Sequence, residues 1–347
     1  MIKDKIKQIS EEIKQISKKD ICLMEVCGTH TMSIARHGIR SLLPSNIRII
    51  SGPGCPVCVT PSGEIETAIN LAKDDRFIIA TFGDMLKVPG KSASLQDYKN
   101  VKIIYNPLES LKLAEDNPLK QVVLLGIGFE TTSPLIASTI KTAHKMSINN
   151  FSVFCMHKTV PSAINLIIDS DKDRNISGLI LPGHVSAITG RRYFDFIKDK
   201  KISGVICGFE ALEIMQTIYI LIRTFELNET IVINNYKTVV SEEGNLTAKK
   251  AVFDVFDMCD SEWRGIGLIK DSGLKIKAKY KEYDAVIKFG LKVVSLPDPA
   301  GCRCGDILMA KAIPNECKYF GKECTPSNPI GPCMVSSEGT CAAFYKY

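Results

Sequence analysis

The first apolar pattern of the chain is a stripe of isoleucines spaced alternately four and three residues apart. The isoleucines of this stripe are Ile2, Ile6, Ile9, Ile13 and Ile16. Such spacing places the side chains on one face of an α-helix. Because only two heptads are present, the pattern favours a helix packed on the core over a coiled-coil dimer. We therefore predict an N-terminal amphipathic helix within residues 1–19.

Beyond this helix, short apolar runs rich in β-branched residues alternate with helical stretches. The runs cover residues 21–26, 47–51, 77–81 and 101–105, then 121–127, 151–156, 178–181 and 204–207, and finally 231–234. This alternation is typical of βαβ units, in which helices cover a parallel sheet. The predicted fold class is α/β, with two open parallel-sheet domains at residues 20–117 and 118–240. A third, Cys-rich domain at residues 241–347 begins with a helical stretch near residues 248–258.

The residues that follow the predicted strands carry most of the reactive side chains. Ligands of open α/β sheets bind beyond the carboxyl ends of the strands. The candidate cleft residues in these positions are Cys27, His30, Asp84, Glu130, Thr131, His157, His184 and Glu210. A single buried Cys or His is commonly a satisfied core group, but this many on one predicted edge favour a functional cleft between the two domains.

Cys55-Pro-Val-Cys58 is a CxxC pair that follows another predicted strand. Thr60 and Pro61 are expected to be the N-cap and first residue of the next helix, so both thiols would lie ahead of a helix amino end. The helix dipole there favours the thiolate, which is the nucleophilic and metal-binding form. The pair fits either a reversible dithiol/disulfide couple accessible from the cleft or two metal ligands, with Cys27 as a third thiol.

Six of the thirteen cysteines lie after residue 301. Without a secretory signal, such density is better explained by metal ligands than by disulfides. The predicted ligands of a [4Fe–4S] cluster are Cys317, Cys324, Cys333 and Cys341. Zinc is the alternative, but four-thiolate zinc sites usually contain paired CxxC motifs, which this tail lacks. Cys302 and Cys304 are left as a candidate redox pair, and a ligand set that uses one of them stays open.

Composition and charge exclude several classes of function. The 44 basic and 38 acidic side chains give a formal net charge of +6 without a dense Lys/Arg stripe, so nucleic acid is not an expected partner. The apolar runs are too short to cross a bilayer, and the amino terminus lacks the apolar core of a signal peptide. We therefore expect a cytoplasmic protein in a reducing setting, without a membrane partner.

Common cofactor motifs are incomplete in this chain. Thr131 stands where a dinucleotide fingerprint needs its third glycine, and Met85 stands at the first glycine of a P-loop. The CxxxCxxC spacing of radical S-adenosylmethionine clusters is absent. Standard nucleotide and radical chemistry therefore lose their usual support.

Five motifs together closely resemble the HypD family of hydrogenase maturation factors. They are Cys27-Gly-Thr-His30, Gly52-Pro-Gly-Cys55-Pro-Val-Cys58, Gly128-Phe-Glu130-Thr131-Thr132, Leu181-Pro-Gly-His184-Val185 and Gly331-Pro-Cys333-Met-Val-Ser-Ser-Glu338-Gly339. The resemblance runs from about residue 20 to the end of the chain, without a departure from the family pattern at these positions. It implies two related α/β domains and a third domain that carries an iron–sulfur cluster.

The resemblance also implies a function, the assembly of the Fe(CN)2CO group of [NiFe] hydrogenases. Members of this family hold iron in a one-to-one complex with HypC, accept cyanide transiently from HypE, and pass the group through HypC to the hydrogenase large subunit. Cys27 is implied as the principal iron ligand, with Cys55 and Cys58 as iron ligands or a redox pair. His184 and Glu338 are implied to assist. A redox-active scaffold fits this function better than a conventional turnover enzyme.

Two other functions stay open on the sequence. A thiol–disulfide oxidoreductase would pass electrons from the cluster through the CxxC pair to a protein partner, without iron cargo. An inert scaffold would use the cluster only to hold its fold. About four iron atoms per chain would fit a cluster alone, whereas additional iron with infrared bands of CN and CO requires the assembly function.

Overall fold

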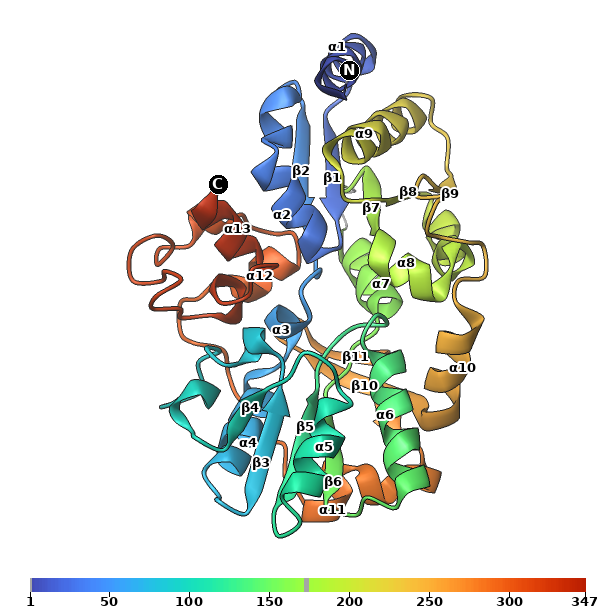
Figure 1. Ribbon diagram of the computed structural model, residues 1–347. Helices are drawn as coiled ribbons and strands as arrows, with labels where there is room; N and C mark the ends of the chain where they lie inside the picture. Colours follow the sequence, from blue (N-terminus) through green and yellow to red (C-terminus); the bar gives the residue numbers. More distant parts are fainter. Residues whose placement is uncertain (1, 172–174) are drawn as a thin grey trace.

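The computed structural model describes residues 2–171 and 175–347. Two α/β lobes lie one above the other, and the carboxyl-terminal segment packs against one side where they meet (Figure 1). In the upper lobe β1 (Ile21–Glu25), and in the lower lobe β3 (Phe77–Thr81), point their carboxyl ends toward this junction. The predicted α/β class with parallel sheets is confirmed.

The upper sheet has five parallel strands in the order β2-β1-β7-β8-β9. Besides β1, they are β2 (Ile47–Ser51), β7 (Gly178–Pro182), β8 (Ser203–Cys207) and β9 (Val232–Asn234). Every residue of β1, Ile-Cys-Leu-Met-Glu, is buried, as expected of a parallel strand that has helices on both faces.

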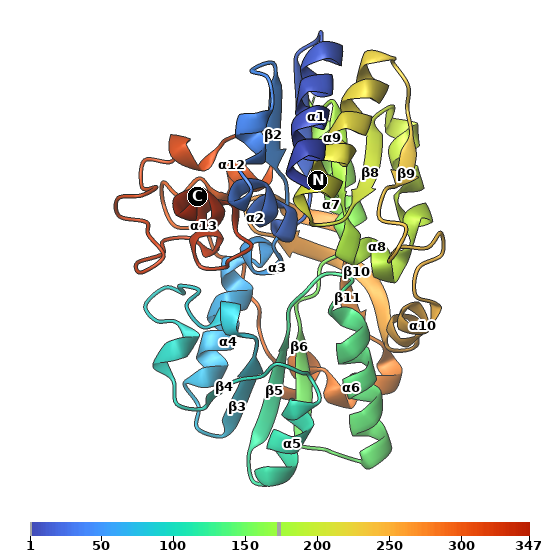
Figure 2. The same ribbon diagram turned by 45° about the horizontal axis from the view of Figure 1, so that its top comes forward.

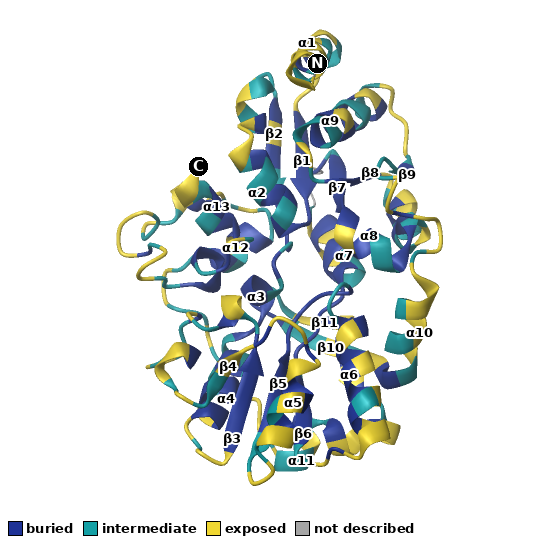
Figure 3. Ribbon diagram, viewed as in Figure 1, coloured by how far each residue is buried: buried dark blue, intermediate teal, exposed yellow. Residues whose placement is uncertain are grey.

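The lower sheet has four parallel strands in the order β4-β3-β5-β6. The other strands are β4 (Val101–Ile103), β5 (Gln121–Gly126) and β6 (Phe151–Cys155). The helices that cover the two sheets are α2 (Gly28–Arg36), α4 (Ser62–Ala72), α5 (Glu109–Asp116), α6 (Ser133–Met146), α7 (Val160–Ser170), α8 (Gly183–Thr189) and α9 (Ala211–Glu226). Figure 3 shows the strands as the buried centre of each lobe, with exposed positions on the outer helices.

The predicted N-terminal helix is confirmed as α1 (Ile2–Ile16). It packs along α9, and Ile13 is fully buried in the same apolar cluster as Ile218. The Ser10 hydroxyl donates to the Leu42 carbonyl (2.6 Å), and the Glu226 carboxylate accepts from backbone N–H groups just after the helix. The isoleucine stripe therefore closes one face of the upper lobe. No helix among the described residues is long and apolar enough to span a membrane.

The division of strands between the lobes differs from the prediction. Residues 20–117 and 118–240 each contribute strands to both sheets, so the chain crosses the junction after β2 and again after β6. Strand and helix alternation identifies βαβ units but not which strands pair. Pairing depends on contacts between segments distant in sequence, such as Leu23 of β1 beside Gly178 of β7.

A buried ion pair joins the two crossing segments. The ammonium of Lys158, just after β6, donates to both oxygens of Glu64 on α4 (2.9 and 3.1 Å) and to the Ser261 hydroxyl (2.8 Å). Only 1% of the Lys158 side chain is exposed. Removing one partner would leave an uncompensated buried charge, so the pair fixes how the crossing segments lie at the junction.

The third predicted domain, residues 241–347, is divided between two places. The predicted helix near residues 248–258 is α10 (Leu246–Val255), and the residues after it form β10 (Phe256–Trp263), which pairs antiparallel with β11 (Gly267–Ile276). This hairpin and α11 (Ala285–Phe289) pack on the lower lobe, because their apolar side chains complete its core.

The Cys-rich tail packs against the side where the lobes meet, and its buried residues join the same apolar cluster as the lobes. Its helices are α12 (Cys304–Leu308), the 3-10 turn η7 (Pro332–Met334) and α13 (Thr340–Lys346). It lies beside α2 and the one-turn helix α3 (Pro56–Val59), and the rotated view of Figure 2 shows the same arrangement. The tail is thus held against the carboxyl end of the upper sheet.

Candidate thiol site

Cys27 follows β1 and is the N-cap residue of α2. Its backbone N–H donates to the buried carboxylate of Glu25 (3.1 Å). Burial, and next the charge of Glu338, raise the pKa of the Cys27 thiol to about 12, although backbone N–H groups of α2 oppose this. The group is therefore a protonated thiol until a cation, such as a metal ion, takes the place of the proton.

Two glycines allow three chain segments to meet at Cys27. A side chain at Gly28 would collide with the Glu338 backbone and Cβ, and one at Gly54 would lie 2.5 Å from the Gly28 nitrogen. The Gly28 N–H donates to the Gly54 carbonyl (3.0 Å), and the Thr29 hydroxyl donates to the Glu338 carboxylate (2.8 Å). The close backbone approach brings the CxxC loop and the tail onto the start of α2.

Replacing Gly54 with alanine is expected to separate these segments. The new Cβ would meet backbone atoms of Cys27 and Gly28, which cannot rotate away, so we expect a loss of about 1–3 kcal/mol in the free energy of unfolding. Gly83→Ala is the matched control, because a Cβ added there would meet nothing within 4 Å, and it should change stability by less than about 0.5 kcal/mol. Urea unfolding measures both, and equal stability of the two variants would contradict the account.

Glu338 and Asp84 share a small pocket next to this meeting point. The Ser336 hydroxyl donates to Asp84 (2.7 Å) and accepts from the Glu338 backbone N–H (3.2 Å). Burial raises the pKa of Glu338. The pocket, with a volume of about 240 Å³, is also lined by Val57 of α3 and by Gly128 after β5. The crossing segment after β2, the lower lobe and the tail therefore contribute to one pocket beside the Cys27 segment.

Cys55 and Cys58 form a disulfide in the structure. Cys55 is the N-cap of α3, and Cys58 lies inside that helix. Thr60 is the C-cap of α3 and not the N-cap of α4, because proline at position 56 starts a helical turn earlier than predicted. Exposure is 3% for Cys55 and 0% for Cys58, so in this state the predicted access from the cleft is absent.

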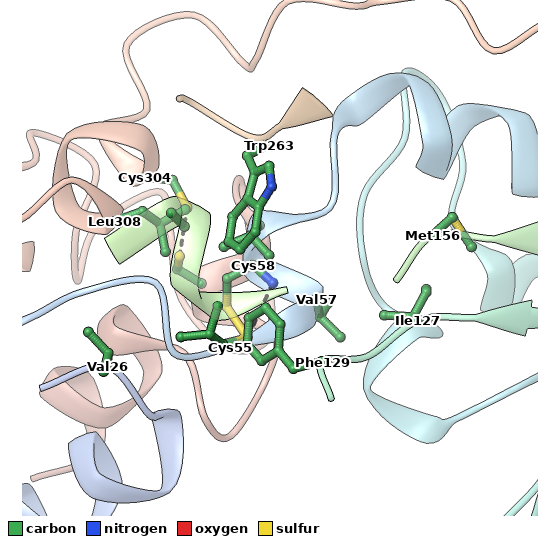
Figure 4. Close-up of a cluster of buried hydrophobic side chains, with 14 of the residues drawn as sticks. Val26, Cys55, Val57, Cys58, Ile127, Phe129, Met156, Trp263, Cys304 and Leu308 are labelled. Carbon is green, nitrogen blue, oxygen red and sulfur yellow. Dashed lines mark hydrogen bonds between the residues drawn. A yellow bond between two sulfur atoms is a disulfide. The ribbon is translucent and has the colours of Figure 1, made fainter. Parts of the chain in front are cut away.

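The disulfide lies between an aromatic pair and the tail (Figure 4). Phe129 and Trp263 stack beside it, with their ring centroids 6.0 Å apart. On the tail side, the Cys58 sulfur is 3.9 Å from the Pro332 carbonyl oxygen. Pro332 immediately precedes Cys333, so the disulfide lies close to the tail cysteines.

All six tail cysteines line one apolar pocket, together with Ile307, Tyr319, Phe320, Ile330 and Met334. None of the six is in a disulfide. The Cys304 and Cys333 sulfurs are hydrogen-bonded at 2.6 Å, and this bond lowers the pKa of Cys304 and raises that of Cys333. Burial raises the pKa of Cys302 to about 12.

The chemistry of this donor set, six thiols in one apolar pocket, fits a four-thiolate cluster, whereas the sulfurs themselves are not arranged around a metal position in the described residues. Soft sulfur donors gathered in an apolar pocket are what a [4Fe–4S] cluster needs. The sulfur–sulfur hydrogen bond joins Cys304 to Cys333 and not to Cys302, so the predicted Cys302–Cys304 pair is not the bonded one. Ligand sets with and without Cys304 therefore stay open.

The predicted three-thiol iron site is not formed in this state. Among residues 2–171 and 175–347, no three His, Cys, Asp or Glu side chains converge in an arrangement ready to hold a metal ion. Cys55 and Cys58 are bonded to each other, so a site that combines them with Cys27 requires reduction first.

Two predicted histidines share one aromatic neighbour close to Cys27. His30 is buried, lies 2.9 Å from the Gly208 carbonyl oxygen through Nε2, and stacks on Phe209 (4.7 Å between centroids). His184 stacks on the same ring at 4.0 Å and is exposed. Burial lowers the pKa of His30 to about 4. His30 is therefore a neutral core group, whereas His184 is free to contact a bound molecule.

Four other predicted cleft residues have structural positions. Burial lowers the pKa of His157 to about 3, and its Nδ1 lies 3.3 Å from Cys155. Glu130 accepts from the Val160 N–H and the Tyr193 hydroxyl, which joins the lobes. Thr131 is partly exposed in the same loop, and Glu210 is the exposed N-cap of α9. The strand-end rule therefore finds residues that lie after the strands, but several of them have buried side chains with partners inside the protein.

Sequence reasoning missed two residues of the site, one that positions Cys27 and one that positions Glu338. Glu25 is completely buried and accepts from both the Cys27 N–H and the Thr31 hydroxyl. A carboxylate inside an apolar strand was the signal that could have identified it. Thr29, the partner of Glu338, had no such signal, because its contact spans 309 residues.

The fold and the site define a class: a two-lobed α/β protein with its thiol chemistry gathered at the junction of the lobes. The family model HypD, described as "Hydrogenase formation hypA family", matches residues 2–347. The chain is 43% identical to the hydrogenase maturation factor HypD2 of Bradyrhizobium diazoefficiens, over 95% of this chain and 90% of that protein. It is 39% identical to the hydrogenase maturation factor HypD of Escherichia coli, over 99% and 93%.

An archaeal protein gives the same result. The chain is 38% identical to a putative hydrogenase expression/formation protein of Methanocaldococcus jannaschii, over 99% of this chain and 95% of that protein. These matches cover both lobes and the Cys-rich tail. The chain belongs to the HypD family of hydrogenase maturation factors.

Proposed function

We propose that this chain assembles the Fe(CN)2CO group of [NiFe] hydrogenases and holds the iron at Cys27 while its ligands are attached. The observation that carries the proposal is the meeting of three segments at one point, where Cys27, the CxxC disulfide and Glu338 approach through Gly28 and Gly54. Iron is the substrate in this function. The assembly is expected to take place in the reducing cytoplasm.

Cys27 and Glu338 are suited to exchange a metal ion for a proton. Burial raises the pKa of both groups; the charge of Glu338 further raises the pKa of Cys27, and the charge of Asp84 further raises that of Glu338. Iron that binds the Cys27 sulfur displaces its proton, and the Glu338 carboxylate can accept that proton. Thr29 orients the carboxylate for this step.

The Cys55–Cys58 disulfide is suited to cyanide release. Reduction by two electrons and two protons gives two thiols. A carrier thiocyanate, R–S–CN, then oxidises the two thiols back to the disulfide. The thiocyanate takes up the two electrons and two protons that the thiols lose, and it leaves as R–SH and HCN. In the dithiol state both sulfurs would also be free to bind iron beside Cys27, since soft thiolates suit iron that carries strong-field ligands.

The tail would supply the electrons for this reduction. A [4Fe–4S] cluster bound by four of the six tail cysteines provides single electrons. Pro332 connects the disulfide to the tail pocket. Its carbonyl oxygen contacts the Cys58 sulfur, and the next residue in the chain, Cys333, lines the pocket. Phe129 and Trp263 shield the opposite side of the disulfide from water, which favours reduction from the tail over reduction by an external thiol.

HypC is the proposed partner in a one-to-one complex, with HypE as transient cyanide donor and the hydrogenase large subunit as recipient. Cys27 supplies only one of the ligands that a six-coordinate iron needs. A second protein must therefore reach the iron and supply further ligands. We expect His184 and Glu338 to line that approach. The net charge of +6 is modest, so shape and apolar area should matter more than charge steering.

Gel filtration tests this partnership. The chain and HypC, mixed with iron and reductant under anaerobic conditions, are expected to elute as a one-to-one complex at both low and moderate salt. Glu115→Gln is a suitable control, because that exposed residue lies on α5, at the end of the lower lobe away from the junction (Figure 1). The scaffold-pair account is wrong for this chain if the mixture never elutes earlier than the separate proteins.

A thiol–disulfide oxidoreductase is the second candidate function. The disulfide between Cys55 and Cys58 favours it, since that reaction needs no iron cargo. The two functions differ in iron content. About four iron atoms per chain fit the cluster alone, and any further iron, lost when Cys27 is replaced, supports assembly.

A further inference from the structure

Arg264 connects the disulfide helix to the cysteine tail. It follows β10, and its backbone N–H donates to the carbonyl of Val59, the last residue of α3 (2.8 Å). Its guanidinium Nε donates to the Thr60 carbonyl (2.9 Å), and Nη1 donates to Asp298 (2.9 Å). Arg264 thus binds two consecutive carbonyls at the carboxyl end of the helix that contains Cys58.

The next residue packs against the tail. Gly265 has a positive φ of 69°, and its Cα lies so close to Gly305 that a side chain on either glycine would collide with the other backbone. Gly305 immediately follows Cys304. Arg264 therefore belongs to a segment that packs directly against the residue next to Cys304, at the edge of the six-cysteine pocket.

The guanidinium is buried and only partly satisfied. Its side chain is 2% exposed, and the buried Nη2 has no hydrogen-bond partner among the described residues. Its counter-ion Asp298 is 30% exposed and also accepts from the Ser62 hydroxyl. A buried cation with a missing acceptor is unfavourable by itself. A negatively charged group in the neighbouring pocket would offset that cost.

We propose that Arg264 is a positioning residue that holds the disulfide helix against the cysteine tail and stabilises the reduced form of a cluster bound there. The inference rests on the cluster of the proposed function. Reduction adds one electron and no proton, with dithionite as the donor in the test. A cluster bound by four thiolates is already anionic, so the added electron is favoured by a fixed positive charge in a medium of low dielectric.

The test is a reductive titration of the reconstituted full-length protein, followed by electron paramagnetic resonance. Arg264→Gln should lower the ratio of reduced to oxidised cluster at a given potential at least tenfold, which is a shift of about 59 mV in the midpoint potential of a one-electron couple. Arg303→Gln is the matched control. Arg303 immediately precedes Cys304 but is 38% exposed and bound to Asp306. Solvent therefore screens its charge, and the ratio of reduced to oxidised cluster should change less than threefold.

Two further variants separate charge from contact. Arg264→Lys retains the charge, and its ratio of reduced to oxidised cluster at a given potential should stay within threefold of that of the unmodified protein. Asp298→Asn retains both hydrogen bonds but removes the counter-charge, so its potential should move upward. If Arg264→Gln does not retain a cluster, Asp298→Asn still tests whether the Arg264 charge stabilises the reduced form.

The outcomes distinguish this inference from the proposed function. Unmodified protein without iron and sulfide would overturn the cluster assignment itself. A loaded protein in which Arg264→Gln and Arg303→Gln shift equally, or Arg264→Lys shifts as far as Arg264→Gln, would overturn the role of the Arg264 charge alone. An unchanged or lowered potential in Asp298→Asn would do the same.

Discussion

Replacement of Cys27 with alanine is expected to reduce hydrogenase maturation to background while the protein remains folded. The thiol lies at the end of β1, where the CxxC loop and the tail meet, and the two CxxC sulfurs are bonded to each other. A single sulfur is removed from a site that is 8% exposed, so stability should change by no more than about 1 kcal/mol. Hydrogenase activity in cells that lack their own copy of the gene measures the loss.

Cys22→Ala is the matched control for this variant. Cys22 is also a buried free thiol of β1, but it lies at the opposite end of the strand, away from the junction. Its replacement should leave maturation intact. Iron analysis adds a second readout: Cys27→Ala should lose the iron beyond the cluster and retain the cluster iron. Maturation at normal levels in Cys27→Ala would remove Cys27 from the iron site.

Replacement of Cys333 with serine is expected to remove the cluster and to loosen the tail. Cys333 is 1% exposed, is hydrogen-bonded to Cys304, and lies beside the disulfide through Pro332. Metal binding contributes to folding energy, so loss of the cluster should make residues 302–347 sensitive to protease while the two lobes persist. Visible absorption, iron and acid-labile sulfide of anaerobically isolated protein measure the first effect.

The controls for this variant also define the ligand set. Cys259→Ser changes a free cysteine of β10 outside the pocket and should retain the full cluster. Cys302→Ser and Cys304→Ser separate the open assignments, because only a true ligand should bleach the absorption when it is replaced. Stoichiometric zinc without sulfide in the unmodified protein would decide for the zinc alternative.

The elements of the fold were largely predictable, but their partners were not. The isoleucine stripe predicts α1, and the β-branched runs predict the parallel strands, because periodicity and burial act locally. Strand pairing is decided by long-range packing, so the division at residue 117 did not follow the sheets. The end of α10 was missed for the same reason: Phe256 pairs with Ile276 in the hairpin, and that contact overrides a helical local pattern.

The candidate site was predictable where a motif marks it. Cys27, the CxxC pair and Glu338 come from motifs, and the structure brings them together. The surrounding contacts depend on backbone approaches that no single-sequence pattern records, such as Gly54 against Cys27. The prediction for Thr60 was wrong although the local pattern supported it. Thr60 was predicted to be the N-cap of a helix, but Pro56 begins α3 four residues earlier, and Thr60 is the C-cap of that helix.

The most direct test of the central claim is infrared spectroscopy of the chain purified anaerobically with HypC. If Cys27 holds the iron while its ligands are added, the complex should show stretching bands of both cyanide and carbon monoxide, and labelling with 13C should shift them. The same bands should be absent from the Cys27→Ala complex. A complex that contains iron only as a cluster and shows neither band would contradict the assembly function and leave a thiol–disulfide oxidoreductase as the better account.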